Sequence, residues 1–368
     1  MRNRSLPLVR ALIVLGFIVV VAAILVTSLI QRANPPEIKQ ISCYVGSEKS
    51  GFLDNPEVQQ ILSDTYGLQV SYTKMGSIEQ AYTDTSQVDC LWPSNTSALE
   101  IYRDRHSAEF TAGTTRYETI FNSPIVLYSW RPIVDALVAD GLVTVVDGRN
   151  TIDTARLASL LTSDPGTPWQ DLGVSGLYGS FNVITTDPTR SNSGNMFFGL
   201  LANMLAGGQV ATVDIMREHL PAIRAFFDSQ GYMEESSGIL FDRFINTGMG
   251  ANPIIANYES LLIEFSVAHR DSLDAIQDEL RIIYPTPTVW SAHPLIARTA
   301  NGQLLIEALR DTRLQEIAWE QHGFRSGLIG VENDPAVLQV ANIPADIDSV
   351  MPLPRADAMI EMLDYLRD

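Results

Sequence analysis

The stretch FNVITTDPTRSNSGNMFFGLLANMLAGG, residues 181–208, decides the fold class because it joins a strand-like run to a helix-like run. FNVI is apolar enough for the end of a buried strand, and NMFFGLLANML is apolar at helical spacing before a Gly-Gly stop. Between them lies the polar junction TTDPTRSNSG, residues 185–194. Capping one helix needs only one side-chain oxygen, so capping alone does not account for this junction. We therefore expect it to contact a ligand at the helix N-terminus.

The same order of strand and helix recurs along the chain and predicts an α/β fold. Strands are expected at 38–45, 68–73, 88–92, 123–130 and 281–285, and helices at 55–67, 77–82 and 97–105. The segment 250–265 predicts a strand that turns into a helix, and the C-terminal third is mostly helical in pattern. This alternation is typical of an open, largely parallel sheet with helices on its faces. Ligands of such sheets bind beyond the carboxyl ends of the strands.

Composition limits the partners of the protein. The chain has 368 residues, 46% of them hydrophobic and 18% charged, which is typical of a globular protein of two ordinary domains. Its formal net charge is −18. An acidic surface of this kind argues against binding to nucleic acid or to anionic lipid headgroups.

A membrane anchor is predicted at residues 11–30, ALIVLGFIVVVAAILVTSLI, because this run has no charged residue. At 1.5 Å per residue it is long enough to cross a hydrocarbon core of roughly 30 Å. Three arginines precede it and one follows it closely, which favours a cytoplasmic N-terminus. The alternative is a cleaved signal peptide, but no small-x-small site closes the run and no cysteine follows for lipid attachment. We expect residues 1–32 to form the cytoplasmic N-terminus and an uncleaved single-pass anchor, and 33–37 an extracytoplasmic linker.

Cys43 and Cys90 are the two cysteines of the chain. They fall in two predicted strands, ISCYV and VDCLW, that are expected to be parallel neighbours, so the two residues should lie close together. An extracytoplasmic domain allows a disulfide, and two buried thiols are the alternative.

Three predicted strand-to-helix junctions are rich in small polar side chains: GSEKSGFLDN at 46–55, PSNTS at 93–97 and TTDPTRSNSG. Hydroxyl groups and free backbone N–H groups at a helix N-terminus favour negative charge. The candidate ligand residues in these junctions are Ser47, Lys49, Ser50, Ser94, Asn95, Thr96, Thr189, Arg190, Asn192 and Ser193. Ser97 and Ser77 each fit a capping box, so we expect both to act as helix caps.

Signatures of catalysis are absent from the sequence. It contains no GxxxxGK[ST], GxSxG, HExxH or CxxC pattern, and its five histidines are not spaced as metal ligands. Glu48, Asp187 and Glu259 are candidate cleft carboxylates, but their spacing assigns no acid and base roles. We expect no catalytic residue, no metal and no cofactor.

The order of these segments resembles the type II periplasmic solute-binding proteins, the extracellular receptors of ABC importers. The resemblance covers most of the chain from residue 38. The segments that support it are YVGSEKSGF, WPSNTSA, IFNSPIVLYSW, TTDPTRSNSGNMFFGLLANML, ANYESLLIEF, IIYPTPTVWSAHP and WEQHGFR. It implies a two-lobed fold with mixed, largely parallel sheets around a central cleft. Lobe 1 would contain 38–125 and 256–368, and lobe 2 would contain 126–255. The two crossovers would lie at SPIVLYSW and IIANYES, which adds Tyr258 and Glu259 at the second hinge to the ligand residues.

The resemblance implies that the protein captures a small ligand outside the cytoplasm and passes it to an ABC permease. The junctions favour an anion or a compound with an anionic group, although Arg190 to Gly194 matches the arginine and Ser-Gly-Thr element of phosphate-binding relatives only weakly. Glu48 and Glu259 would favour an amine-bearing ligand if both faced the cleft. A ligand sensor or a scaffold subunit of a membrane complex on the same fold is the alternative, with other membrane proteins as partners.

Overall fold

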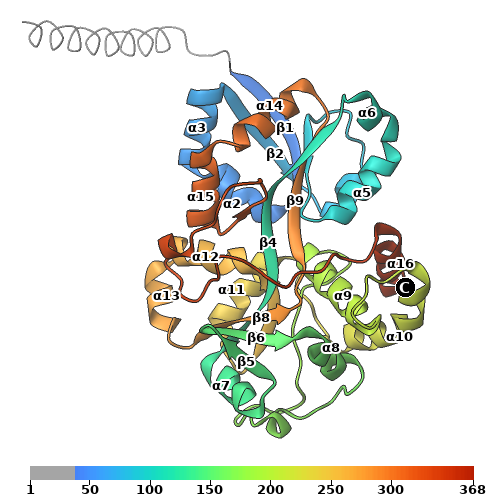
Figure 1. Cartoon of the computed structure of the whole chain (residues 1–368), viewed down its shortest axis with the longest axis vertical. Coiled ribbons are helices and arrows are strands. Elements are labelled where there is room, and N and C mark those ends of the chain that lie inside the picture. The colour runs from blue at the N-terminus through green and yellow to red at the C-terminus, as the bar shows by residue number, and fades with distance from the viewer. Residues whose placement is uncertain (1–37) are drawn as a thin grey trace, which may run out of the picture.

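The computed structural model describes residues 38–368 (Figure 1). The predicted anchor at 11–30 and the linker at 33–37 lie outside this range. Among the residues from 38 onward, no helix combines the length and the apolar character needed to cross a membrane.

The first half of the fold is built on three parallel strands. β1 (Lys39–Val45) lies between β2 (Leu68–Lys74) and β3 (Cys90–Trp92), and β9 (Trp290–Ala297) pairs with β3 in the antiparallel direction. The longer helices of this half are α3 (Pro56–Tyr66), α5 (Thr96–Arg105), α14 (Ala300–Leu309) and α15 (Thr312–His322). The predicted strands and helices of residues 38–105 are confirmed, and α3 starts and ends as expected: the Asn55 side chain accepts the Glu57 N–H at 2.9 Å, and Gly67 has a φ of 63°.

The second half is built around the end of the long strand β4 (Arg116–Trp130). This part of β4 pairs with β7 (Ile254–Tyr258) and β8 (Leu280–Thr286), and β6 (Arg149–Asp153) and β5 (Val143–Val146) extend the sheet. Its helices are α7 (Arg131–Asp140), α8 (Thr154–Thr162), α9 (Asn192–Leu205), α10 (Val213–Ser229), α11 (Ser237–Thr247), α12 (Glu259–Ala268) and α13 (Arg270–Ile276). FNVI, the predicted strand before α9, forms only an isolated bridge between Ile184 and Ile255.

Two of the connections between the halves are made at strands of the sheets, and one of these crossovers lies where the sequence predicted it. β4 pairs with β9 through its first part and with β7 and β8 through its second part, so SPIVLYSW does cross between the sheets. The second crossover is the short link 287–289 between β8 and β9 and not IIANYES (Figure 1). The prediction failed because the sequence of a short, fully buried apolar strand does not indicate which sheet the strand joins. In the structure, β7 pairs with the second-half part of β4.

Apolar packing follows the two halves. One core gathers Phe52, Trp92, Phe121 and Phe324, and a larger one contains Tyr128, Phe241 and Phe244. The larger core also takes the apolar side chains of 259–289, a segment that the predicted lobe boundaries assign to lobe 1. Those boundaries concern which parts move together, and they stay a prediction.

The C-terminal helix α16 (Ala356–Arg367) packs across both halves (Figure 1). Met359, Met362 and Leu363 are buried in the larger core, next to α10. Ala356 and Ile360, on the same helix, pack against a third, smaller cluster of the first half that includes Leu91 and Tyr102. The last helix of the chain therefore bridges the two halves.

The remaining elements are short: η1 (Ser47–Lys49), α2 (Ser50–Asp54), α4 (Ser77–Tyr82), α6 (Ser107–Ala112), η2 (Trp169–Leu172), β10 (Arg325–Ser326) and η3 (Pro335–Val337). Two predicted caps are wrong. The N-cap of α5 is Asn95, whose side chain accepts the Ala98 N–H at 2.8 Å, because the helix begins before Ser97. Ser77 is the first residue of α4, and its hydroxyl accepts the Ser94 N–H at 2.9 Å instead of capping the helix.

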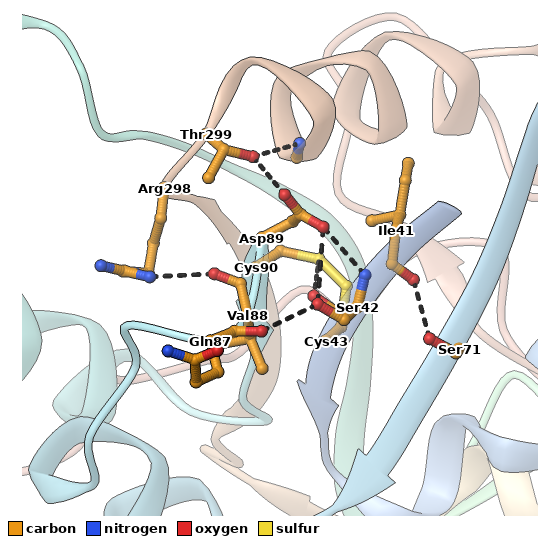
Figure 2. Close-up of a disulfide and its surroundings, with 11 residues drawn as sticks. Ile41, Ser42, Cys43, Ser71, Gln87, Val88, Asp89, Cys90, Arg298 and Thr299 are labelled. Atoms are coloured by element: carbon orange, nitrogen blue, oxygen red, sulfur yellow. Dashed lines mark hydrogen bonds between the residues drawn. A yellow bond between two sulfur atoms is a disulfide. The ribbon is translucent and has the colours of Figure 1, made fainter. Parts of the chain in front are cut away.

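Cys43 and Cys90 are directly opposite each other on the parallel strands β1 and β3 and form a disulfide (Figure 2). Their Cα atoms are 4.6 Å apart, which confirms the predicted proximity and decides between the disulfide and two free thiols. Beside the disulfide, the Asp89 carboxylate accepts hydrogen bonds from the Ser42 N–H at 3.0 Å and the Thr299 hydroxyl at 2.6 Å. These bonds tie β1, β3 and the start of α14 together.

Candidate functional site

A cavity of about 250 Å³ lies between the halves, where β1, β2 and β7 end. Its lining comes from both halves: Gly46, Ser47, Glu48, Lys74, Met75, Gly76, Ser77, Glu79, Arg190, Ser191, Asn192, Glu235, Ser236, Ser237 and Tyr258. A second pocket of about 520 Å³ shares the residues around Gly76 and Arg190 and continues toward α16. This position matches the rule that ligands of α/β sheets bind beyond the carboxyl ends of the strands.

The residues predicted as ligand contacts divide into three groups. Ser47, Arg190, Asn192 and Tyr258 line the cavity, and Thr189 lines the larger pocket. Lys49, Ser94 and Asn95 are buried behind the cavity wall. Ser50, Thr96, Ser193 and Glu259 line neither space.

Asn192, the first residue of α9, connects the two halves at the edge of the cavity. Its amide nitrogen donates to the Ser94 carbonyl at 2.9 Å and to the Tyr258 hydroxyl at 2.9 Å. Its amide oxygen accepts from the Asn95 side chain. The junctions PSNTS and TTDPTRSNSG, which are far apart in the sequence, therefore contact each other directly.

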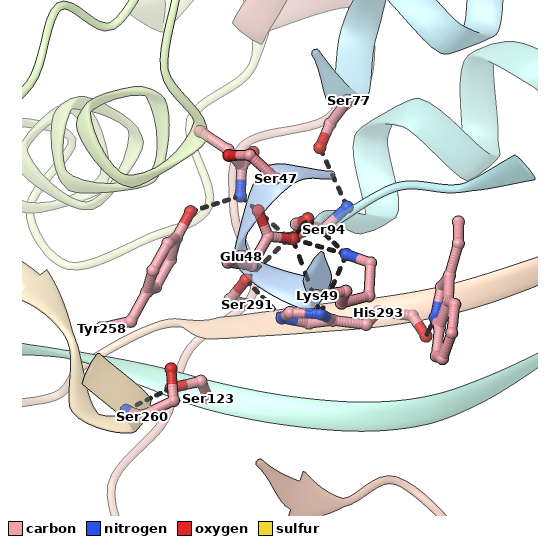
Figure 3. A network of polar contacts seen from close by, with 12 residues as sticks. Ser47, Glu48, Lys49, Ser77, Ser94, Ser123, Tyr258, Ser260, Ser291 and His293 are labelled. Carbon is pink, nitrogen blue, oxygen red and sulfur yellow. Dashed lines mark hydrogen bonds and ion pairs between the residues drawn. The ribbon is translucent and has the colours of Figure 1, made fainter. Parts of the chain in front are cut away.

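A buried polar cluster stands behind the first-half wall of the cavity (Figure 3). Lys49 is fully buried and contacts the Glu48 carboxylate, the Ser94 hydroxyl at 2.8 Å and His293 Nδ1 at 3.2 Å. The Ser94 hydroxyl also donates to Glu48. Ser291 completes the cluster, 3.0 Å from His293 Nε2. The positive charge of Lys49 is thus balanced inside the protein and is not free for a ligand.

The charge states in this cluster follow from burial and from the close contacts. Burial raises the pKa of Glu48, but the Lys49 charge and the hydrogen bonds from Lys49 and Ser94 outweigh this effect, and the pKa is lowered to about 2. Burial lowers the pKa of Lys49, against the opposing effect of Glu48. Burial and the nearby Lys49 charge hold the pKa of His293 well below its usual value. At neutral pH Glu48 is therefore ionised and His293 is neutral.

Two long helices begin at the second-half wall of the cavity. Ser191 precedes α9 and Ser236 precedes α11, and neither serine side chain forms a capping hydrogen bond. The N–H groups of Asn192 and Ser237, the first residues of the two helices, form no hydrogen bond with residues 38–368. Helix N-termini in this state offer unpaired donors and the positive end of the helix dipole.

Part of the polar junction 185–194 serves its own conformation. The Thr186 hydroxyl accepts the Gly194 N–H at 2.8 Å and lies 2.8 Å from the Ser193 hydroxyl. The Asp187 carboxylate accepts from the N–H and hydroxyl of Thr189 at 2.8 and 2.7 Å. A Cβ on Gly194 would come within 2.1 Å of the Thr186 carbonyl oxygen, so glycine is needed for this close approach. These internal bonds account for several hydroxyls that the sequence pattern assigned to a ligand.

Solved structures with the same arrangement were found, whereas no family model and no curated protein matches the chain. Iron-bound HitA from Pseudomonas aeruginosa has a TM-score of 0.58 at 14% identity, over 89% of this chain and 98% of its own. Apo ferric ion-binding protein A from Pasteurella haemolytica has a TM-score of 0.52 at 12% identity, over 89% and 96%. The substrate-binding protein of an ABC transporter from Agrobacterium tumefaciens has a TM-score of 0.53 at 14% identity, over 91% and 96%. The chain has the type II solute-binding-protein fold.

One of these structures is of an iron-bound protein and another is of a ferric ion-binding protein, which raises the question of a metal site in this chain. Within the described part of the chain, no three His, Cys, Asp or Glu side chains are grouped so that they could hold a metal ion. Of the three acidic side chains that line the cavity, Glu48 contacts Lys49 and Glu235 pairs with Arg190, so only Glu79 is without an ion pair to residues 38–368.

Glu259, at the start of α12, is held away from the cavity. Its carboxylate accepts two hydrogen bonds from Arg325, at 2.7 and 3.1 Å, and one from the Tyr284 hydroxyl at 2.7 Å. Glu259 and Arg325 are 0% and 4% exposed. No local sequence pattern indicates this network, because its members come from three separate segments. Ser236 was not predicted from the sequence, although a local pattern could have indicated it: a serine precedes an apolar run with helical spacing.

Proposed function

We propose that this solute-binding-fold protein is held at the outer face of the cell membrane by residues 11–30 and captures a small ligand with an anionic group. The ligand would bind in the 250 Å³ cavity, contacting Ser47, Arg190, Asn192 and Tyr258 among the residues predicted from sequence. An ABC permease would then receive it. One observation carries the ligand class: α9 and α11 both begin at this cavity, and neither Ser191 nor Ser236 caps the helix that follows it.

The physical basis is the set of donors at these helix ends. Preorganised N–H and O–H groups bind an oxyanion without a full countercharge, because they replace the water around it. Lys74 adds a positive charge, since it lines the cavity and forms no ion pair with residues 38–368. Arg190 is paired with Glu235, and both side chains are more than half exposed, so this pair can rearrange around a ligand.

Binding is favoured over catalysis by the state of the buried cluster. The Ser94 side chain is fully buried, so a substrate in the cavity does not reach its hydroxyl. Lys49 and His293 are likewise enclosed by protein atoms. This arrangement supports a structural role for the cluster, as a wall of the cavity.

A thermal-shift screen of the soluble domain 33–368 tests the ligand class. Oxyanions, carboxylates, amino acids and polyamines are compared, since a ligand at 100 times its dissociation constant adds about 2.7 kcal/mol to the free energy of unfolding. We expect stabilisation by compounds with an anionic group, weakened in a Ser191→Ala, Ser236→Ala double variant. Glu320→Gln, an exposed change on α15, is the matched control and should leave binding unchanged. Stabilisation by polyamines alone would contradict the proposal.

The alternative, a ligand sensor or scaffold in a membrane complex, is favoured by one comparison. A solved structure titled "Two-component system protein mediate signal transduction" has a TM-score of 0.52 at 9% identity, over 89% of this chain and 100% of its own. Mild solubilisation of membranes followed by identification of co-purifying proteins separates the two roles. ABC permease subunits support import, and other membrane proteins support the sensor or scaffold.

The anchor has its own test. An uncleaved anchor keeps Met1 or Arg2 in the mature protein, and the protein fractionates with membranes. A mature soluble form that starts near Ala33 would contradict anchoring and would leave the proposed ligand class unaffected.

A further inference from the structure

We infer that the ligand is a small zwitterion, with its anionic group at the start of α9 and α11 and an ammonium group at Glu48. This inference rests on the proposed function and narrows its ligand class. It is carried by two features of one cavity: a carboxylate oxygen of Glu48 that has no donor among residues 38–368, and the N–H groups at the start of α9 and α11 that have no acceptor among them.

Glu48 supplies the acceptor. One carboxylate oxygen, Oε1, accepts from Lys49 and from the Ser94 hydroxyl. The other, Oε2, has no hydrogen-bond donor among residues 38–368, although the side chain is only 7% exposed and lines the cavity. Oε2 is not among the enclosed polar atoms, so a ligand ammonium group in the cavity can reach it and donate to it.

The backbone in front of Glu48 keeps room for this contact. A Cβ on Gly46 would lie 2.5 Å from Oε1 and 3.0 Å from Oε2 of Glu48. Gly46 also lines the cavity. The absence of a side chain at this position therefore leaves the carboxylate accessible from the cavity side.

The lining carries charges of both signs. Glu48 is paired with Lys49, whereas Glu79 and Lys74 line the cavity beside it and form no ion pair with residues 38–368. The opposite wall carries Ser191 and Ser236, whose side chains do not cap α9 and α11. A zwitterion supplies an anionic group for the helix N–H groups and an ammonium group for Oε2 of Glu48, whereas a simple amine would leave the helix N–H groups unpaired.

The size of the cavity limits the zwitterion. Its volume, about 250 Å³, falls below the roughly 300–1,000 Å³ of pockets that hold drug-sized ligands. A zwitterion whose charged groups are separated by a short chain of atoms fits this volume.

Matched sets of small compounds test this inference by calorimetry on the unmodified domain 33–368. The zwitterions are β-alanine, 4-aminobutyrate and phosphoethanolamine. Each is compared with its N-acetyl derivative, with the amine-free acid (propionate, butyrate, ethyl phosphate) and with an acid-free amine (propylamine, butylamine, ethanolamine). We expect at least one zwitterion to bind at least tenfold more tightly than all of its relatives, which corresponds to about 1.4 kcal/mol.

Each outcome decides between the two proposals. Equal binding of the zwitterions and the amine-free acids would overturn the inference and keep the proposed anionic ligand class. Binding of the amines alone would overturn both. No binding of any zwitterion would overturn the inference.

A variant assigns the ammonium contact to Glu48. Glu48→Gln should weaken zwitterion binding at least tenfold and leave the amine-free acids unchanged or more tightly bound, and the Glu320→Gln control should change neither. Circular dichroism and the urea midpoint confirm that the variant is folded. Undiminished zwitterion binding to folded Glu48→Gln would overturn the assignment. If that variant does not fold, the ligand series on the unmodified protein still decides the question.

Discussion

The buried pair of Glu259 and Arg325 offers the sharpest test of how the structure differs from the sequence pattern. The pattern placed Glu259 among ligand contacts, whereas its carboxylate forms a bidentate pair with Arg325 and accepts a third bond from Tyr284. Removing one partner of a buried ion pair leaves the other charge uncompensated and costs about 3–5 kcal/mol. We therefore expect Glu259→Gln to lower the free energy of unfolding by about that amount while leaving ligand affinity unchanged.

Arg325 forms further contacts in addition to its ion pair with Glu259. It also donates to the carbonyls of Pro344 and Ala345, both at 2.6 Å, and stacks 5.0 Å from the Trp319 ring. Arg325→Met should therefore be at least as destabilising as Glu259→Gln. The double variant should lose less than the sum of the two single changes, because neither charge is then left unpaired.

Urea unfolding followed by tryptophan fluorescence measures these differences, with the midpoint falling and the slope unchanged. Glu320→Gln is the control, since exposed changes away from such pairs usually stay within about 0.5 kcal/mol. A Glu259→Gln variant of normal stability that no longer binds ligand would refute the structural role and restore the role predicted from sequence.

Three further predictions concern the disulfide, the cluster and the contact between the halves. Replacing Cys43 and Cys90 with alanine should lower the free energy of unfolding by about 4 kcal/mol, because the bond spans 47 residues; urea midpoints that do not change would contradict this. The pKa of Glu48 is lowered from 4.5 to about 2, so its stabilising contribution is complete above pH 4.5 and is lost as the pH falls toward 2. The stability difference between the unmodified protein and Glu48→Gln, followed by urea unfolding, should shrink over that interval, and a constant difference would count against the pairing. Asn192→Ala removes the side-chain hydrogen bonds that Asn192 forms between the halves at the cavity. Small-angle scattering without ligand should therefore give a larger radius of gyration, and an unchanged radius would mean that other contacts hold the halves together.

The strands and helices were predictable from sequence because their signals are local. The strand ISCYV, the helix between Asn55 and Gly67 and the short helix SIEQAY all have apolar periods and end signals within a few residues. The parallel pairing of β1 with β2 and β3, which brought the two cysteines together, followed from the alternation of strand and helix.

The site was less predictable because its contacts join distant segments. Lys49 looked like a free base in a polar junction, yet it is neutralised by Glu48 and contacts His293, 244 residues away. Glu259 looked like a hinge carboxylate, yet its partner Arg325 is 66 residues further along the chain. Side-chain pairing of this kind depends on the order of strands in the sheets, and the local periodicity of apolar residues does not indicate that order.

The helix α16 has a consequence for the time at which the protein becomes complete. Residues 359, 362 and 363 fill the larger core, and Gly199 of α9 leaves room for the Met359 side chain, which a Cβ would approach within 3.1 Å. Synthesis proceeds from the N-terminus, so this core lacks a wall until α16 has been made. A chain that ends before α16 would expose the apolar surfaces of α9 and α10 to solvent, which invites aggregation or proteolysis. An intact α16 thus distinguishes a fully packed molecule from a truncated fragment before any ligand is met.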